Sequence, residues 1–188
     1  MIVLFSAHPY PDRSRANRAL LEAVRDLPDL EIRSLYDLYP DFDIDVPTEQ
    51  DALTRAAGIV WQHPIYWYSV PGLFKHWFDK VLLRGWAYGE GGTALAGKRC
   101  LWTPTTGGDP SLYQPGAIHG FPFSAFVPVV EQTARFCGMR WEEPFIVHGS
   151  HRISDQALDE TCRRYRARLL ALGEQLRTAA PAGARSEA

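Results

Sequence analysis

The stretch Ile2-Val3-Leu4-Phe5-Ser6 decides how this chain folds. A continuous apolar run without polar alternation is typical of a parallel strand that is covered on both faces. Four further segments have the length and composition of strands, and they lie at 30–35, 58–63, 99–103 and 141–147. Because helical patterns separate these segments, the sequence predicts a doubly wound parallel sheet.

Apolar residues recur at helical spacing between the strands, and capping residues mark several of the helix ends. Ser14 and Ser154 are good N-caps, and a proline such as Pro71 is tolerated in the first turn of a helix. Gly138 is suited to the position just after a helix. The predicted helices follow Ser14, cover 49–57, run from Pro71 through Val81, cover 123–137, and run from Asp155 onward.

The segments between these elements are predicted as loops. Two prolines, Pro9 and Pro11, exclude helix before Ser14. The segment 36–47 is acidic, aromatic and bounded by proline, and 85–97 carries five glycines. The fold class is therefore α/β: a flavodoxin-like, five-stranded parallel sheet in the order 2-1-3-4-5 with helices on both faces. We expect a single domain over 1–180 and a disordered tail over 181–188.

Composition excludes several classes of function. The net charge of −2 over 188 residues, with no basic stripe, does not fit a nucleic-acid-binding surface. The three cysteines are far apart and odd in number, so neither a metal site nor a disulfide framework is expected. No run is long and apolar enough for a membrane span, and no signal peptide is recognised. These features predict a cytoplasmic protein.

The loop after the first strand has the features of an anion site. Ser14 offers a hydroxyl at a helix N-terminus, where free N–H groups and the helix dipole favour a phosphate. Asn17 adds an amide donor, and His8 with Arg13 or Arg15 can supply positive charge. A plain capped helix explains the same residues equally well.

Two other strand-end loops are expected at the same edge of the sheet. Ile65-Tyr66-Trp67-Tyr68 places apolar and aromatic residues in a turn, as the wall for a flat ring or as core or interface packing. Thr105-Thr106-Gly107-Gly108 lets the backbone approach a ligand closely, although an ordinary turn is the simpler explanation of that motif alone. An anion site, an aromatic wall and backbone donors together are what flavin mononucleotide (FMN) requires.

Longer strings of sequence resemble the NAD(P)H:quinone oxidoreductase family of flavodoxin-like flavoproteins. They are Gln-His-Pro-Ile-Tyr-Trp-Tyr-Ser-Val-Pro at 62–71, Lys-His-Trp-Phe-Asp-Lys-Val at 75–81, and Thr-Thr-Gly-Gly at 105–108 with Gly-Ala-Ile-His-Gly at 116–120. Within the family, the strings at 34–45 and 85–95 are most similar to the ancillary subunits of bacterial glutathione-regulated potassium-efflux systems.

The resemblance implies a role for each of the three loops. It places the flavin phosphate at His8 and at Ser14, Arg15, Ala16 and Asn17, and the flavin ring against Ile65, Tyr66, Trp67 and Tyr68. It places the pyrimidine edge of the ring at Thr105, Thr106, Gly107 and Gly108. Tyr113 and His119 match the positions that neutralise and relay charge during hydride transfer, with loop packing as their alternative. The other histidines (His63, His76, His148 and His151) are expected to be structural or on the surface.

The resemblance also implies an activity and partners. It implies two-electron NAD(P)H-dependent quinone reduction by a ping-pong cycle, in a homodimer whose shared site suits the aromatic residues Trp67, Tyr68, Trp86 and Tyr88. The short segment 36–47 favours FMN over FAD. A second hypothesis is a regulatory subunit that binds a membrane potassium-efflux antiporter and so lies peripherally at the inner membrane. A flavodoxin-type electron carrier ranks last, because such carriers are strongly acidic.

Overall fold

A computed structural model describes residues 1–179 of the chain, and the predicted tail at 181–188 lies outside the described residues. Five parallel strands form one sheet in the order β2-β1-β3-β4-β5, which confirms the predicted topology. The strands are β1 (Ile2–Ser6), β2 (Leu30–Ser34), β3 (Gly58–Pro64), β4 (Arg99–Thr105) and β5 (Arg140–Trp141).

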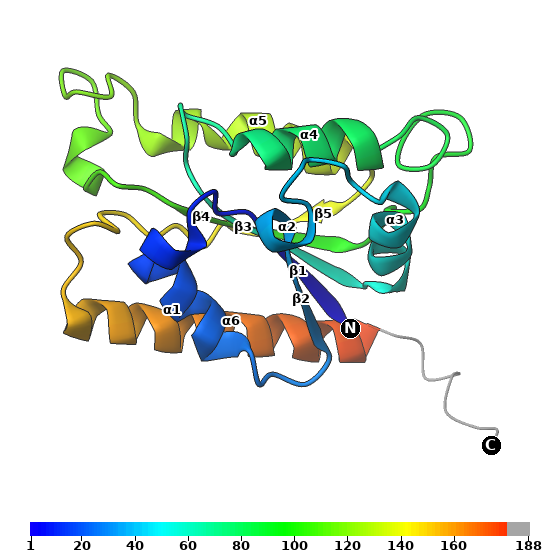
Figure 1. Cartoon of the computed structure of the whole chain (residues 1–188), viewed down its shortest axis with the longest axis horizontal. Helices are drawn as coiled ribbons and strands as arrows, with labels where there is room; N and C mark the ends of the chain where they lie inside the picture. Colours follow the sequence, from blue (N-terminus) through cyan, green and yellow to red (C-terminus); the bar gives the residue numbers. More distant parts are fainter. Residues whose placement is uncertain (180–188) are drawn as a thin grey trace.

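Helices cover both faces of the sheet (Figure 1). One face packs against α1 and α6, whose buried residues include Leu20, Tyr165 and Leu169. The other face packs against α3, α4 and α5, with Leu53 and Trp77 in the core. The α-helices are α1 (Arg15–Val24), α2 (Leu35–Leu38), α3 (Val46–Arg55), α4 (Gly72–Val81), α5 (Val127–Phe136) and α6 (Asp155–Ala179). Among residues 1–179, no helix has both the length and the apolar character needed to cross a membrane.

The segment 36–47 is not wholly a loop as predicted. It begins inside the short helix α2 and ends inside α3, which starts at Val46 rather than at residue 49. The Asp45 side chain accepts a hydrogen bond from Thr48 N, and Pro47 lies in the first turn. Asp45 is exposed to solvent and acts as the N-cap of α3.

The fifth strand was predicted over 141–147 and is much shorter. Only Arg140 and Trp141 pair regularly with β4, and Pro144 lacks the N–H that a continuous ladder needs. The chain nevertheless stays beside β4, because Glu142 N donates to Cys100 O and Val147 N donates to Pro104 O. This irregular run brings residues 147–151 to the carboxyl end of β4.

Two further boundaries differ from the predictions. The helix expected over 123–137 is a 3-10 turn (Phe123–Ala125) followed by α5. The prolines before Ser14 do not exclude all helical structure, because Pro11–Arg13 forms one 3-10 turn with Pro11 at its first position. Proline is compatible with that position, where its missing N–H has no helical partner. The segment 85–97 contains no helix or strand, as predicted.

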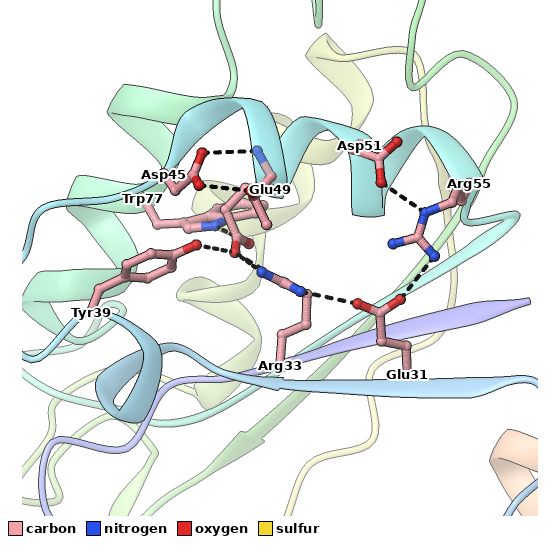
Figure 2. A network of polar contacts seen from close by, with 9 residues as sticks. Glu31, Arg33, Tyr39, Asp45, Glu49, Asp51, Arg55 and Trp77 are labelled. Atoms are coloured by element: carbon pink, nitrogen blue, oxygen red, sulfur yellow. Dashed lines mark hydrogen bonds and ion pairs between the residues drawn. The ribbon is translucent and has the colours of Figure 1, made fainter.

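A buried carboxylate joins β2, α3 and α4 (Figure 2). Glu49 is fully buried and accepts hydrogen bonds from Arg33 Nε (3.0 Å), the Tyr39 hydroxyl (2.6 Å) and Trp77 Nε1 (2.9 Å). Arg33 also pairs with Glu31 at 3.0 Å. Burial, with the hydrogen bond to Glu49, raises the pKa of Tyr39 to about 12. A buried charge is tolerated only when it is paired in this way.

Candidate functional site

The loop after β1 and the first turn of α1 form one wall of a cavity of about 340 Å³. The cavity lies at the carboxyl end of the strands, where open α/β sheets bind ligands. Ser14 is the N-cap of α1, and its Oγ accepts a hydrogen bond from Asn17 N at 3.2 Å. Of the predicted cofactor residues, nine line this cavity: His8, Ser14, Arg15, Ala16, Asn17, Ile65, Tyr66, Thr105 and Gly107.

Asn17 has a different environment from the one predicted. Its side-chain amide donates to Thr105 Oγ1 at 2.9 Å, and Gln62 Nε2 donates to its backbone carbonyl at 3.1 Å. Tyr165 donates to Gln62 Oε1 at 2.8 Å, so the chain of bonds reaches α6. The Asn17 amide therefore joins the first turn of α1 to the end of β4.

Arg13, Arg15 and His8 line the cavity. Arg15 donates to Ile153 O at 2.6 Å and pairs with Asp155, so it fastens α1 to the start of α6. Arg13 lines the cavity and lies over the ring of Tyr10, with 5.8 Å between its Cζ and the ring centroid. Burial lowers the pKa of His8, and the nearby charge of His151 lowers it further.

The aromatic turn after β3 is only partly directed at the cavity. Ile65 N donates to Thr105 O at 2.8 Å, which places Ile65 beside the fourth loop. Trp67 and Tyr68 have φ values of 48° and 64°, a left-handed conformation that non-glycine residues adopt at a cost of roughly 1 kcal/mol or more each. The Trp67 side chain is 91% exposed, and Tyr68 stacks on Phe126 at 5.2 Å rather than lining the cavity.

The glycine motif after β4 divides into two parts. Gly107 faces the cavity, and a Cβ there would lie 2.7 Å from Cδ2 of His151. The Thr106 side chain is buried and turned away from the cavity, where its Oγ1 donates to Gly108 O at 2.8 Å. A side chain at Gly107 would therefore collide with the His151 ring at the edge of the cavity.

Tyr113 and His119 lie together. Their rings stack with centroids 4.1 Å apart and an interplanar angle of 17°. A Cβ on Gly108 would be 3.0 Å from His119 Nε2, so the pair packs against the glycine motif. The buried Nδ1 of His119 has no hydrogen-bond partner among the described residues. Burial raises the pKa of the Tyr113 phenol, and hydrogen bonding to the Thr106 side chain acts in the opposite direction.

The sequence analysis missed the segment that follows β5. Ser150 and His151 line the cavity, and His151 also borders a second cavity of about 680 Å³ together with His148. The sequence His-Gly-Ser-His at 148–151 has no hydrophobic periodicity that would indicate a helix or a strand. The sequence also did not show where the fifth strand ends. His63, in contrast, is structural as expected, because it is buried and accepts a hydrogen bond from Trp102 Nε1 at 2.7 Å.

Two of the aromatic residues assigned to a shared dimer site are less accessible than expected. Trp86 and Tyr88 are only partly exposed and pack against the main core, in contrast to Trp67. Tyr88 also contacts Phe136 of α5 with centroids 4.9 Å apart. The glycine-rich segment 85–97 therefore covers the end of α5 with these two side chains.

Comparison with known proteins places this geometry in context. A family model described as flavodoxin-like fold matches residues 1–169. The glutathione-regulated potassium-efflux system ancillary protein KefF of Salmonella typhi is 51% identical over 174 residues, which cover 93% of this chain and 98% of that protein. General stress protein 14 of Treponema denticola, solved in complex with FMN, is 34% identical with a TM-score of 0.86 over 91% of this chain and 98% of its own. An NADPH-quinone reductase from P. pentosaceus is 26% identical with a TM-score of 0.81 over 89% of this chain and 96% of its own.

Proposed function

The chain belongs to the flavodoxin-like fold family, and from that membership we propose that it is an FMN-dependent NAD(P)H:quinone oxidoreductase. One observation carries the proposal: the cavity joins the N-terminus of α1 to Gly107, and the next residue, Gly108, packs against the stacked pair of Tyr113 and His119. The relatives solved with FMN or named as NADPH-quinone reductases support this choice of cofactor and reaction.

The residues present fit FMN. The first-turn N–H groups of α1 and the Ser14 hydroxyl suit its phosphate, with Arg13 and His8 nearby. Ile65 supplies an apolar contact, and the backbone of Gly107 lines the cavity beside the His151 ring. We keep FAD as the alternative, since the cavity continues toward Ser150 and His151.

When bound, FMN supplies the chemistry of accepting a hydride from NAD(P)H and passing two electrons to a quinone. This chain supplies the proton donors and the shielding from water. Tyr113 presents a neutral phenol, whose raised pKa keeps its proton in place at neutral pH. His119, held against Tyr113 and with its buried Nδ1 unpaired among the described residues, is suited to exchange a proton with a reacting oxygen. NAD(P)H and quinone use the same slot in turn, which makes the cycle ping-pong.

A second role is favoured by the 51% identity to the KefF ancillary protein. We propose that the chain also binds and activates a potassium-efflux antiporter, and that it is cytoplasmic and reaches the inner membrane through that partner. We further propose a homodimer. The exposed Trp67 and Ile118, at 91% and 80%, provide apolar surface at the mouth of the site for a second copy.

Two variants separate binding from chemistry. His119→Ala should slow flavin reduction by NAD(P)H at least tenfold while FMN remains bound, because it removes the proton-exchanging group. Ser14→Ala should instead weaken FMN binding, and Asp45→Ala is its matched control, because Asp45 caps a helix remote from the cavity. Unchanged reduction by the His119 variant would contradict its role, and equal loss of FMN in both cap variants would contradict the phosphate site.

A further inference from the structure

The glycine motif is held in place by the segment that follows β5. Three backbone hydrogen bonds join the two: Thr106 N donates to Val147 O (2.9 Å), Ser150 N donates to Thr106 O (2.8 Å), and Gly149 N donates to Gly108 O (2.9 Å). One side-chain contact is added, between Thr106 Oγ1 and His148 Nδ1 at 2.9 Å. The segment after β5 therefore positions the backbone of the glycine motif and also borders the cavity through Ser150.

The Thr106 hydroxyl is the centre of this contact. It has one proton and two neighbours at hydrogen-bond distance that can accept it, Gly108 O at 2.8 Å and His148 Nδ1 at 2.9 Å, and the Tyr113 phenol is a further polar neighbour. Both contacts are satisfied together only if the hydroxyl donates to Gly108 O and the His148 Nδ1–H donates to Thr106 Oγ1. In the other tautomer, the imidazole would compete with the Gly108 carbonyl for the same proton.

His148 is well placed to hold that tautomer. Its ring packs edge-on against Phe123 with centroids 5.1 Å apart, and lies 5.6 Å from the ring of Tyr113. His148 borders the second cavity, and its Nε2 makes no hydrogen bond to any of the described residues. Because Thr106 is buried, a lost donor at this point cannot be replaced by bulk water.

We infer that His148 is a positioning residue for the cofactor: its Nδ1–H donates to Thr106 Oγ1 and commits the Thr106 hydroxyl to Gly108 O. That bond fixes the Gly108–Asp109 peptide, and with it the position of the preceding Gly107 backbone at the cavity. The inference deepens the proposed function, because it takes FMN as that ligand. It assigns a role to a histidine that lies outside the loop of Tyr113 and His119.

The first test needs no cofactor. Long-range proton–nitrogen NMR of the FMN-free protein reports which ring nitrogen of His148 carries the proton. The expected result is the Nδ1–H tautomer at neutral pH. The Nε2–H tautomer would overturn the inference, whether or not the protein binds FMN, so this result stands apart from the proposed function.

The second test measures FMN affinity by quenching of flavin fluorescence. His148→Leu removes the donor and should weaken binding about fivefold, the effect of one neutral hydrogen bond. His148→Asn keeps an N–H donor near the position of Nδ1 and should restore affinity to within about twofold of the unmodified protein. In a Thr106→Val background, His148→Leu should have no further effect, because the partner is already gone.

Several outcomes would overturn the inference. If His148→Asn binds FMN as weakly as His148→Leu, the donor is not what matters. If His148→Leu weakens binding equally with and without the Thr106 hydroxyl, the effect does not pass through Thr106. If the unmodified protein does not bind FMN at all, the proposed function fails, and the NMR result alone decides the hydrogen-bond assignment.

Discussion

Replacement of Glu49 by glutamine tests how the buried network supports the fold (Figure 2). The carboxylate is fully buried and accepts hydrogen bonds from Arg33, Tyr39 and Trp77. Glu49→Gln removes the negative charge and turns an amide N–H₂ toward one of the donors. The Arg33 side chain, which is only 13% exposed, then keeps Glu31 as its one remaining acidic partner in this network.

The expected loss of stability follows from the burial of the pair. Breaking a buried ion pair from one side costs roughly 3–5 kcal/mol of the free energy of unfolding, since the remaining charge stays buried. For a chain of this size that loss lowers the melting temperature by about 10 °C. Urea unfolding at pH 7, followed by tryptophan fluorescence, measures the change.

Asp51→Asn is the matched control on the same helix. Asp51 pairs with Arg55 at 2.9 Å, but both side chains are exposed, at 67% and 48%, so its loss should change the free energy of unfolding by less than about 0.5 kcal/mol. If Glu49→Gln unfolds within about 1 kcal/mol of Asp51→Asn, the network does not stabilise the fold in the way described.

Three more perturbations address the site and its supports. Gly107→Ala should leave the urea midpoint nearly unchanged, because the added Cβ meets only the exposed His151 ring, at 2.7 Å. The same variant should weaken FMN binding at least tenfold, and tight FMN binding by this variant would place the flavin elsewhere. Thr105→Val leaves the buried Asn17 amide without its acceptor and should cost roughly 1–3 kcal/mol of unfolding free energy, measured in urea, whereas Thr133→Val on the exposed face of α5 should cost little. Burial lowers the pKa of His63 to about 4, so the unfolded chain binds a proton at higher pH than the folded one. The free energy of unfolding should therefore fall by about 2 kcal/mol between pH 7 and pH 5. His63→Gln should flatten that part of the pH profile, and an unchanged slope in this variant would contradict the assignment to His63.

The sheet was predictable because its central strands are buried on both faces and are therefore mostly apolar. The apolar run at Ile2–Ser6 is buried at every position. Ser14 and Ser154 each accept a hydrogen bond from a backbone N–H three residues later, and so cap the first turns of α1 and α6. Such local signals act on neighbouring residues, so they can be recognised without knowledge of the tertiary structure.

The course of the fifth strand and of the segment at 147–151 that follows it could not be predicted in the same way. Their course depends on hydrogen bonds to β4, such as Val147 N to Pro104 O, that involve residues more than 40 positions apart in the sequence. Pro144 interrupts regular pairing without turning the chain away from the sheet. For the same reason His148 and His151 could not be distinguished from surface histidines.

Within the site, residue types were more predictable than their contacts. The rings of Tyr113 and His119 stack and Gly107 faces the cavity, but the roles that the resemblance implies for them stay predictions. Asn17 was expected to supply an amide donor; it lines the cavity, and its amide also bonds to Thr105, 88 residues away in the sequence. Only the packing of α1 against the end of β4 creates this second contact of the amide.

Reconstitution with FMN tests the proposed function most directly. The purified chain is titrated with FMN, and its absorption spectrum is followed during anaerobic addition of NADH or NADPH and then of a quinone. We predict stoichiometric binding, bleaching of the flavin absorption by the nicotinamide, and full recovery of the absorption by the quinone. A chain that binds neither FMN nor FAD, or a bound flavin that NADH and NADPH both fail to bleach, would contradict the proposal.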